Sequence, residues 1–214
     1  MKVFSTRFVK MAPVGLALAG LALLGTVGVR RGFAQQNQNF DKVEVQVLPV
    51  QGNVYMLSGA GGNITAQEGK DGVLLVDTSF APMAPKILAA IKGITNRPLR
   101  YIINTHVHGD HTGGNEALSK AGATIAGGNF AGTTSDIGNT ASIIAHERVQ
   151  QRLSEQKPPV SFGMLPTNTY FTESKELYFN GEAIQILHQP NAHTDGDSLV
   201  FFRRSDVVST GDIF

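Results

Sequence analysis

The feature that most constrains this chain is a string of six residues, His106–His111, which reads His-Val-His-Gly-Asp-His. It closely follows the apolar run Tyr101–Ile103, which has the character of a buried strand. Proteins place imidazole and carboxylate groups this close together mainly to bind a divalent transition metal, most often zinc. The chain is therefore predicted to build a metal site at the end of a strand.

The spacing within this string predicts how its ligands are shared. His106 and His108 are two residues apart in an extended segment, so their imidazoles point to the same side and can share one ion. Gly109 permits a sharp turn, after which Asp110 and His111 can face a second ion about 3.5–4 Å from the first, as in two-metal hydrolases. The alternative is a histidine-rich surface loop, which the position at a strand end disfavours.

The composition limits both the ligand types and the partners. The chain has 214 residues and no cysteine, so any metal must be held by His, Asp or Glu rather than by a thiolate. Its 18 Lys and Arg residues balance 17 Asp and Glu residues, which gives no basic footprint of the kind that nucleic-acid binding requires. A hydrophobic content of 42% is enough for a proper core, in one large or two small domains.

The N-terminal residues have the pattern of a targeting segment. Basic residues within the first ten positions precede an apolar run over residues 11–29, and Gly32-Phe33-Ala34 forms a small-x-small cleavage signal before Gln35. We therefore expect residues 1–34 to be a signal peptide and residues 35–214 to be an exported domain, periplasmic or secreted from a bacterium, with no membrane association after cleavage. The alternative is an inner-membrane anchor, because the apolar run is nearly long enough to span a bilayer and Arg30-Arg31 follows it.

Hydrophobic periodicity and turn signals predict strands mixed with helices along the rest of the chain. The expected strands are Val43–Val47, Val54–Leu57, Ile64–Gln67, Val73–Val76, Tyr101–Ile103, Ala141–Ala145, Leu177–Phe179, Ala183–Leu187, Leu199–Phe202 and Val207–Thr210. The expected helices are Pro82–Ile91, Asn115–Ala121 and Glu147–Gln156, and the Gly-, Ser- and Thr-rich stretch 127–139 is expected to be a mobile loop. This pattern predicts an α+β architecture, with sheet layers covered by helices.

Two further segments carry candidate ligands for the metal. His193 lies just past a predicted strand and is the natural third ligand beside His106 and His108. Asp212 also follows a predicted strand, after Gly211, where a carboxylate can bridge two ions. Each would be an ordinary loop or turn residue on its own, and each gains weight from the histidine string.

Other polar residues near these segments are expected to have supporting or structural roles. Asp77 ends a buried strand and is either an acceptor for a metal-bound histidine or a turn residue. The Gly-rich tip Ser58–Gly62 is either one wall of the substrate cleft or a plain hairpin turn, and Asn115 is expected to help cap the following helix. The residues expected in the core, in loops or in turns behind the ligands are His146, His188, Asp195 and Asp197.

These motifs resemble the metallo-β-lactamase superfamily. The resemblance rests on Asn104–Asn115, His193-Thr194 and Gly211-Asp212, and it covers residues 43–214. It implies a four-layer αββα sandwich with a dinuclear metal site at one edge. By resemblance, a first zinc ion would be held by His106, His108 and His193 and a second by Asp110 and His111, with Asp212 as the bridge.

The chain departs from the family pattern in two places. The family has a further histidine for the second metal, and no histidine follows His193 here. We therefore expect a C-terminally truncated domain with an incomplete second half, in which the second ion binds weakly. Asp212 stands where the best-known zinc β-lactamases carry cysteine, serine or another residue, which makes the chain look more like the thioesterase and lactonase branches.

The function expected from the resemblance is a zinc-dependent hydrolase that acts on a small-molecule substrate. A metal-bound hydroxide would attack the carbonyl of an ester, thioester, lactone or β-lactam. Asp110 would act catalytically, by orienting the hydroxide and moving its proton. The alternatives are a single-iron oxidoreductase, similar to the persulfide dioxygenases of the same superfamily, and an inactive metal-binding fragment.

Overall fold

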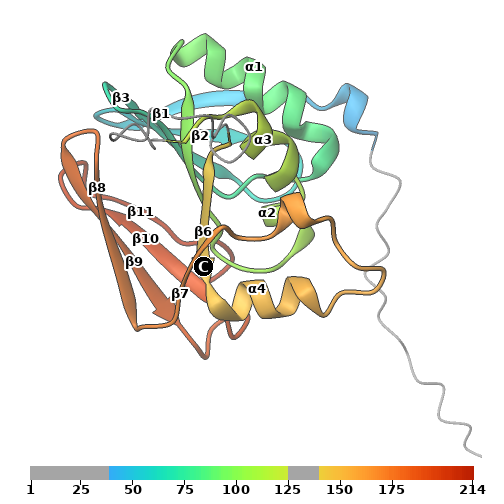
Figure 1. Cartoon of the computed structure of the whole chain (residues 1–214). Helices are drawn as coiled ribbons and strands as arrows, with labels where there is room; N and C mark the ends of the chain where they lie inside the picture. The colour runs from blue at the N-terminus through green and yellow to red at the C-terminus, as the bar shows by residue number, and fades with distance from the viewer. Residues whose placement is uncertain (1–38, 125–139) are drawn as a thin grey trace, which may run out of the picture. The chain divides into compact units, whose positions relative to one another are not determined.

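Two β-sheets pack face to face in the computed structural model, which describes residues 39–124 and 140–214 (Figure 1). These residues belong to one unit of the chain, Asn39–Phe214. The predicted signal peptide at residues 1–34 and the predicted loop at residues 127–139 lie outside the described residues. Within the described part of the chain, no helix is long and apolar enough to cross a membrane.

The larger sheet changes from antiparallel to parallel pairing along its strand order, β1-β2-β3-β4-β5-β6-β7. Strands β1 to β4 form an antiparallel meander, whereas β4 to β7 pair in parallel and are connected through helices. The C-terminal ends of β4, β5 and β6 therefore lie at the same edge. The strands are β1 (Gln46–Gln51), β2 (Val54–Ser58), β3 (Ile64–Gly69), β4 (Gly72–Val76), β5 (Leu99–Ile103), β6 (Ser142–His146) and β7 (Asn168–Tyr170).

The smaller sheet is antiparallel throughout, in the order β11-β10-β9-β8. Its strands are β8 (Ser174–Phe179), β9 (Glu182–Gln189), β10 (Asp197–Phe202) and β11 (Val207–Ser209). The predicted hairpin between β8 and β9 is confirmed. Asn180 and Gly181 both have positive φ, 51° and 81°, as a tight two-residue hairpin turn requires.

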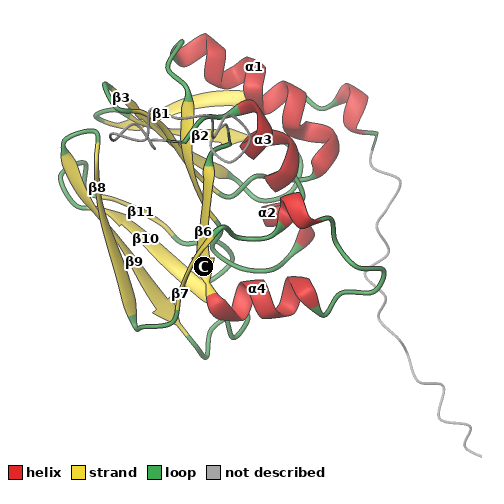
Figure 2. Cartoon of the chain, in the orientation of Figure 1, coloured by secondary structure: helices red, strands yellow, loops and turns green. Residues whose placement is uncertain are grey.

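The helices lie against the larger sheet, on the side away from the smaller one (Figure 2). They are α1 (Ala84–Ile94), α3 (Asn115–Ala121) and α4 (Glu147–Ser154), with a single-turn helix α2 (Gly109–Thr112) and three short 3₁₀ turns at Phe40–Lys42, Ala81–Met83 and Phe162–Met164. The described residues thus form helix, sheet and sheet layers, which confirms the α+β sandwich. In the described part of the chain, the helices pack on the larger sheet. By contrast, Tyr178 and Val208 of the smaller sheet are exposed to solvent.

Alternate side chains of β4 pack into two different hydrophobic cores, one on each face of the larger sheet. β4 is buried at every position, as its continuous apolar run predicts for a strand covered on both faces. Leu75 faces the core beneath α1 and α3, with Ile87 of α1 as a neighbour in that cluster. Leu74 and Val76 point the other way, into the core between the two sheets. A third, smaller cluster lies beneath α4.

Several strands extend beyond their predicted bounds, as β8 does by three residues at its start, and two strands differ more fundamentally from the sequence-based expectation. The strand predicted at Val43–Val47 is misplaced, because pairing begins at Gln46 and the alternating residues Val43 and Val45 instead pack against the core under α1 before the strand starts. Every residue of β1 is exposed, and Pro49 is tolerated there because β1 is an edge strand paired on one side. Strand β7 was not expected, because a three-residue strand is too short to show a periodicity.

Candidate metal centre

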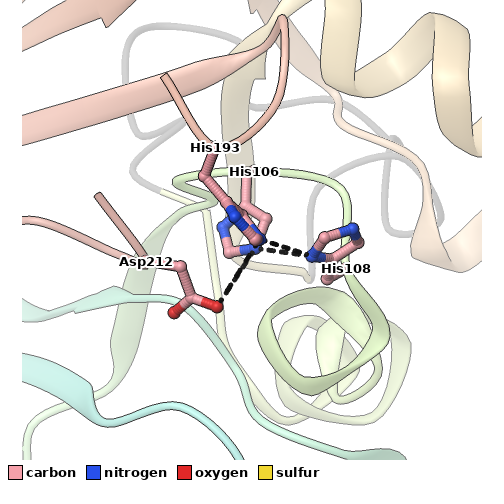
Figure 3. A group of neighbouring side chains, drawn as sticks. All are labelled: His106, His108, His193 and Asp212. Atoms are coloured by element: carbon pink, nitrogen blue, oxygen red, sulfur yellow. Dashed lines mark hydrogen bonds and ion pairs between the residues drawn. The ribbon is translucent and has the colours of Figure 1, made fainter. Parts of the chain in front are cut away.

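Segments far apart in the sequence bring four ligand-type side chains to one point at the edge of the sandwich (Figure 3). His106 and His108 follow β5, His193 lies between β9 and β10, and Asp212 follows β11. Their ligand atoms all lie within 4.8 Å of one another. This is the grouping expected for the first metal, with the proposed bridging carboxylate beside it.

The distances within this group fit a small tetrahedral ion. His108 Nδ1 lies 3.2 Å from His106 Nε2 and 3.0 Å from His193 Nε2. Asp212 Oδ2 lies 3.9 Å from His106 Nε2 and 3.8 Å from His193 Nε2. Ligand atoms about 2.0–2.1 Å from a tetrahedral zinc would be about 3.3–3.4 Å apart, which lies between the two sets of distances. The donor set of three imidazoles and a carboxylate therefore suits zinc in chemistry and in size.

A second group shares Asp212 with the first. It consists of Asp110, His111 and Asp212, whose ligand atoms also lie within 4.8 Å of one another. His111 Nε2 is 3.1 Å from Asp212 Oδ1 and 3.6 Å from Asp110 Oδ2. That nitrogen is buried and makes no well-formed hydrogen bond among the described residues. A buried donor or acceptor in this state is costly, and an ion at this point would satisfy it.

The buried carboxylate of Asp77 lies directly behind the metal loop. It accepts hydrogen bonds from the backbone N–H of Thr105 at 2.7 Å and from the Thr105 hydroxyl at 2.8 Å, and it lies 2.8 Å from His111 Nδ1. This contact leaves Nε2 of His111 as the nitrogen that faces Asp212. Of the two roles expected for Asp77, the structure therefore supports that of acceptor for a metal-site histidine.

The two buried histidines have opposite electrostatic surroundings. Burial, with the neighbouring imidazoles of His111 and His108, lowers the pKa of His106 to about 4 against the opposing pull of the carboxylates. Burial alone would also lower the pKa of His111, but the hydrogen bond to Asp77 and the charges of Asp77, Asp110 and Asp212 raise it to about 9. In the metal-free protein, His106 is neutral at pH 7 and ready to bind an ion, whereas His111 carries a proton.

A network of buried polar side chains, which the sequence did not predict, supports the loop that carries His106–His111. The Thr78 hydroxyl and the Asn104 amide both donate to the backbone carbonyl of His111. Asn115 exchanges hydrogen bonds with Asn104, at 2.9 and 3.0 Å, and donates to the carbonyl of Met164. The capping role expected for Asn115 is wrong, because Gly114 precedes α3 without a side-chain cap and the Asn115 side chain belongs to this network.

The turn between β2 and β3 closes one side of the centre. Gly62 packs against the imidazole of His111, and Gly61 packs against Asp110 and the ring of Phe80. Gly61, Gly62 and Asn63 also line a cavity of about 390 Å³ that reaches His111 and Asp212. The Gly-rich tip is therefore a wall of the site, and its glycines allow the close approach.

The four residues expected in the core, in loops or in turns surround the loop that carries His193. His146 ends β6, is buried and stacks on His188 at 3.6 Å between ring centroids. His188 Nε2 donates to the backbone carbonyl of Asp195, whose carboxylate pairs with Arg152 of α4. Asp197 accepts a hydrogen bond from the N–H of Thr194. None of these four belongs to either group of candidate ligands in the described part of the chain.

The sequence of this chain also matches a known protein family. A family model described as the metallo-beta-lactamase superfamily matches residues 57–214. The chain therefore belongs to the metallo-β-lactamase superfamily, as the histidine string predicted.

Several known proteins are similar to this chain. A curated relative, the 2,4-dinitroanisole O-demethylase subunit alpha of Nocardioides sp. (strain JS1661), is 27% identical over 175 residues, which cover 78% of this chain and 47% of the relative. A metallo-β-lactamase of Novosphingobium pentaromativorans has a similar fold, with a TM-score of 0.56 at 21% identity, over 76% of this chain and 58% of that one. The subclass B3 metallo-β-lactamase of Bradyrhizobium japonicum gives 0.59 at 17% identity, over 77% and 59%. The chain thus spans about half the length of the curated relative it matches.

Proposed function

We propose that this protein is a zinc-dependent hydrolase that acts on a small-molecule substrate. The single observation that supports this most is the convergence of His106, His108, His193 and Asp212 within 4.8 Å, next to a second group that shares Asp212. Membership of the metallo-β-lactamase superfamily supports the same reading. A di-zinc class B3 metallo-β-lactamase from an Alaskan soil metagenome shares the fold, with a TM-score of 0.58 at 18% identity.

In this proposal, each of the two groups of side chains would hold one ion. His106, His108 and His193 would hold the first ion, and Asp110 and His111 would hold a second, with Asp212 between them. Zinc, when bound, supplies Lewis acidity that polarises a carbonyl and lowers the pKa of a coordinated water to about 7. His106 and His111 are fixed from behind by Thr105 and Asp77, so their orientation does not depend on the substrate.

Asp110 is the proposed catalytic carboxylate. It lies in the first turn of the short helix α2, its side chain is about one third exposed, and its Oδ2 lies 3.6 Å from His111 Nε2. A carboxylate at this position can orient the attacking water, accept its proton and deliver that proton to the leaving group. The chain has no cysteine to serve as a competing thiol nucleophile.

The proposed substrates are small carbonyl compounds: an ester, a thioester, a lactone or a β-lactam. The solved β-lactamases share only the fold with this chain at their level of identity. The relative named as a 2,4-dinitroanisole demethylase extends the range worth testing to an activated aryl methyl ether.

The experiment combines metal analysis with turnover on the full chain. We expect one or two zinc ions per chain, and chelator-sensitive turnover of a chromogenic β-lactam, a nitrophenyl ester, a lactone or 2,4-dinitroanisole. The variant with His106→Ala and His108→Ala should lose both the metal and the turnover. A chain that binds no zinc, or turnover that survives both the chelator and this double variant, would overturn the proposal.

The same preparation distinguishes the two alternatives. Imidazole and carboxylate ligands also suit iron, so a chain that retains iron and consumes oxygen with a persulfide would be an oxidoreductase. A chain that binds zinc but turns over none of the carbonyl substrates would be a metal-binding fragment.

We also propose that residues 1–34 direct export and are removed before Gln35. The support is the sequence pattern alone, a basic start, an apolar run and a small-x-small signal. N-terminal sequencing of the protein recovered from a bacterial periplasm should begin at Gln35. An intact N-terminus in the membrane fraction would instead support the anchor.

A further inference from the structure

The His193 imidazole lies in the connection between β9 and β10 and is about one third exposed. His106 has Thr105 Oγ1 at 3.0 Å from its Nδ1, and His111 has Asp77 Oδ2 at 2.8 Å from its Nδ1. Among the described residues, Nδ1 of His193 has no hydrogen-bond partner. Apart from the contact of its Nε2 with His108 Nδ1 at 3.0 Å, this ring is therefore held in position by the backbone around it.

Three interactions hold that backbone. The N–H of Thr194 donates to Asp197 Oδ2, and His188 Nε2 lies 3.0 Å from the carbonyl oxygen of Asp195. The Asp195 carboxylate accepts two hydrogen bonds from Arg152, Nε to Oδ1 at 3.3 Å and Nη2 to Oδ2 at 2.9 Å. The first two interactions come from the neighbouring strands. The pair with Arg152 joins the loop to helix α4 by hydrogen bonds, beside the place where Gly196 of the loop packs against Val149 of that helix.

Helix α4 gives Arg152 a firm base. Val149 and Leu153 on either side of it along the helix are buried in the cluster beneath α4. The guanidinium makes a forked contact with Asp195, and its Nη1 also donates to Glu155 Oε2 at 3.3 Å on its own helix. A forked contact fixes direction as well as distance, which distinguishes it from a single-point surface ion pair.

We infer that Arg152 is a positioning residue for the first metal: through its forked contact with Asp195, it holds the His193 loop so that His193 Nε2 faces His106 and His108 before an ion binds. This rests on the proposed function, because it takes His193 as a ligand. Arg152 has no part in the second group, Asp110, His111 and Asp212.

The inference predicts a selective loss. Substitutions behind metal ligands typically weaken metal binding about 10–100-fold. Because Arg152 acts through the loop rather than on the ring itself, we expect a loss of about tenfold, at the lower end of that range. Affinity at the second group should change far less, since His111 and Asp110 are held by Asp77 and α2.

The test compares Arg152→Met, Arg152→Lys and Arg148→Met in the full chain. Arg148 is the matched control: it lies on the same helix and its guanidinium donates to Gln151 of that helix at 3.0 Å rather than to the loop. Affinities for Zn²⁺ and Co²⁺ are measured by chelator competition, and the Co²⁺ absorption spectrum reports the ligand geometry of each site. Far-UV circular dichroism and the thermal midpoint of the metal-free proteins monitor folding.

We expect Arg152→Met to bind the first ion about tenfold more weakly and to alter the first-site Co²⁺ spectrum, with Arg148→Met unchanged. Arg152→Lys keeps a long aliphatic side chain and the positive charge but cannot make both hydrogen bonds to Asp195. Its loss of affinity for the first ion should therefore be smaller than that of Arg152→Met. Exchange of the pair, Arg152→Asp with Asp195→Arg, should recover part of the affinity.

Other outcomes would overturn the inference. Equal affinities in Arg152→Met and the wild type, or equal losses in Arg152→Met and Arg148→Met, would show that the fork does not position His193. A loss that follows only a lower thermal midpoint of the metal-free protein would show a general effect of folding. A wild-type chain that binds no ion would overturn the proposed metal centre itself, and this inference with it.

Discussion

The surroundings of His111 raise its pKa, so that metal binding at this residue competes with a proton. Its Nδ1 lies 2.8 Å from Asp77, and its Nε2 faces Asp212 and Asp110. Burial opposes the charged form, but these carboxylates raise the pKa of His111 to about 9. The nitrogen that would bind an ion therefore carries a proton at neutral pH.

The affinity of the second group for zinc should rise with pH. Below pH 9 the metal-free His111 is protonated, so each ion must displace a proton and the apparent affinity should rise up to about tenfold per pH unit until it levels off near pH 9. Calorimetric titrations in two buffers of different ionisation enthalpy count the released proton. Asp77→Asn removes the main partner, so its affinity should level off at a lower pH. Binding that is independent of pH between 6 and 9 would contradict this.

A single methyl group at Gly62 should disturb the same histidine. A Cβ at this position would lie 2.6 Å from His111 Nε2, so the imidazole would have to move. We expect Gly62→Ala to weaken zinc at the second group by at least about tenfold and to cost about 1–3 kcal/mol of stability through overpacking. Gly93→Ala is the control, because a Cβ there meets nothing within 4 Å in α1. Metal titration and urea unfolding check both, and unchanged binding in Gly62→Ala would refute the expected clash.

At the scale of elements, a buried carboxylate ties the two sheets together at β9. Glu182 begins β9, and its oxygens accept hydrogen bonds from Gln67 of β3, from the Ser205 hydroxyl and from the N–H groups of Arg204 and Ser205. Hydrogen bonds to a charged acceptor are worth about 1.5–3 kcal/mol each when their loss leaves a buried donor unpaired. This contact therefore orients the smaller sheet against the larger one.

Truncation of this side chain should be severe. Glu182→Ala leaves four donors without their acceptor, and we expect a loss of about 3 kcal/mol or more in the free energy of unfolding. Glu176→Ala is a matched control, because Glu176 is exposed on β8 and contacts Gln185 alone, so its effect should stay within about 0.5 kcal/mol. Denaturant unfolding followed by circular dichroism measures both. Similar midpoints for the two variants would count against the role of Glu182.

Local chemistry decided which elements the sequence could predict. The buried run in β4, the Asn180-Gly181 hairpin and helix α3 were predicted because each carries its signal within a few residues. The start of β1 was misplaced, because the same alternation of valines serves an unpaired segment packed on the core. The single turn α2 was missed because its four residues, Gly109–Thr112, are too few to show a helical period.

The candidate site divides in the same way. The spacing within His106–His111 was enough to predict a metal site. His193 and Asp212 were predicted as further ligands because that string was present. The network of Thr78, Asn104 and Asn115 and the pair of Arg152 with Asp195 involve contacts between residues up to 49 positions apart. Such pairs leave no mark on local sequence pattern, so they required the folded structure.

At the scale of the whole molecule, metal binding should stabilise the entire fold. Ligands that bind only the native state add about 2.7 kcal/mol at a concentration of 100 Kd, which for a domain of this size corresponds to a rise of roughly 5–10 °C in the Tm. Calorimetry of the full chain with zinc and with chelator measures this shift. The variant with His106→Ala and His108→Ala keeps only the second group, so its shift should be much smaller, and an equal shift in that variant would place the binding elsewhere.

A bound ion would also act as a cross-link in this protein. The chain has no cysteine, so no disulfide can join its distant segments. An ion shared by His108 and His193 would close a loop between residues 85 positions apart, and closure of a loop of about 100 residues is worth roughly 4–5 kcal/mol in the chain-entropy account of disulfides. Zinc would then stabilise this fold by cross-linking distant segments, as disulfide bonds do in many exported proteins. Its resistance to proteases would follow the supply of the metal, independently of the redox state of its surroundings.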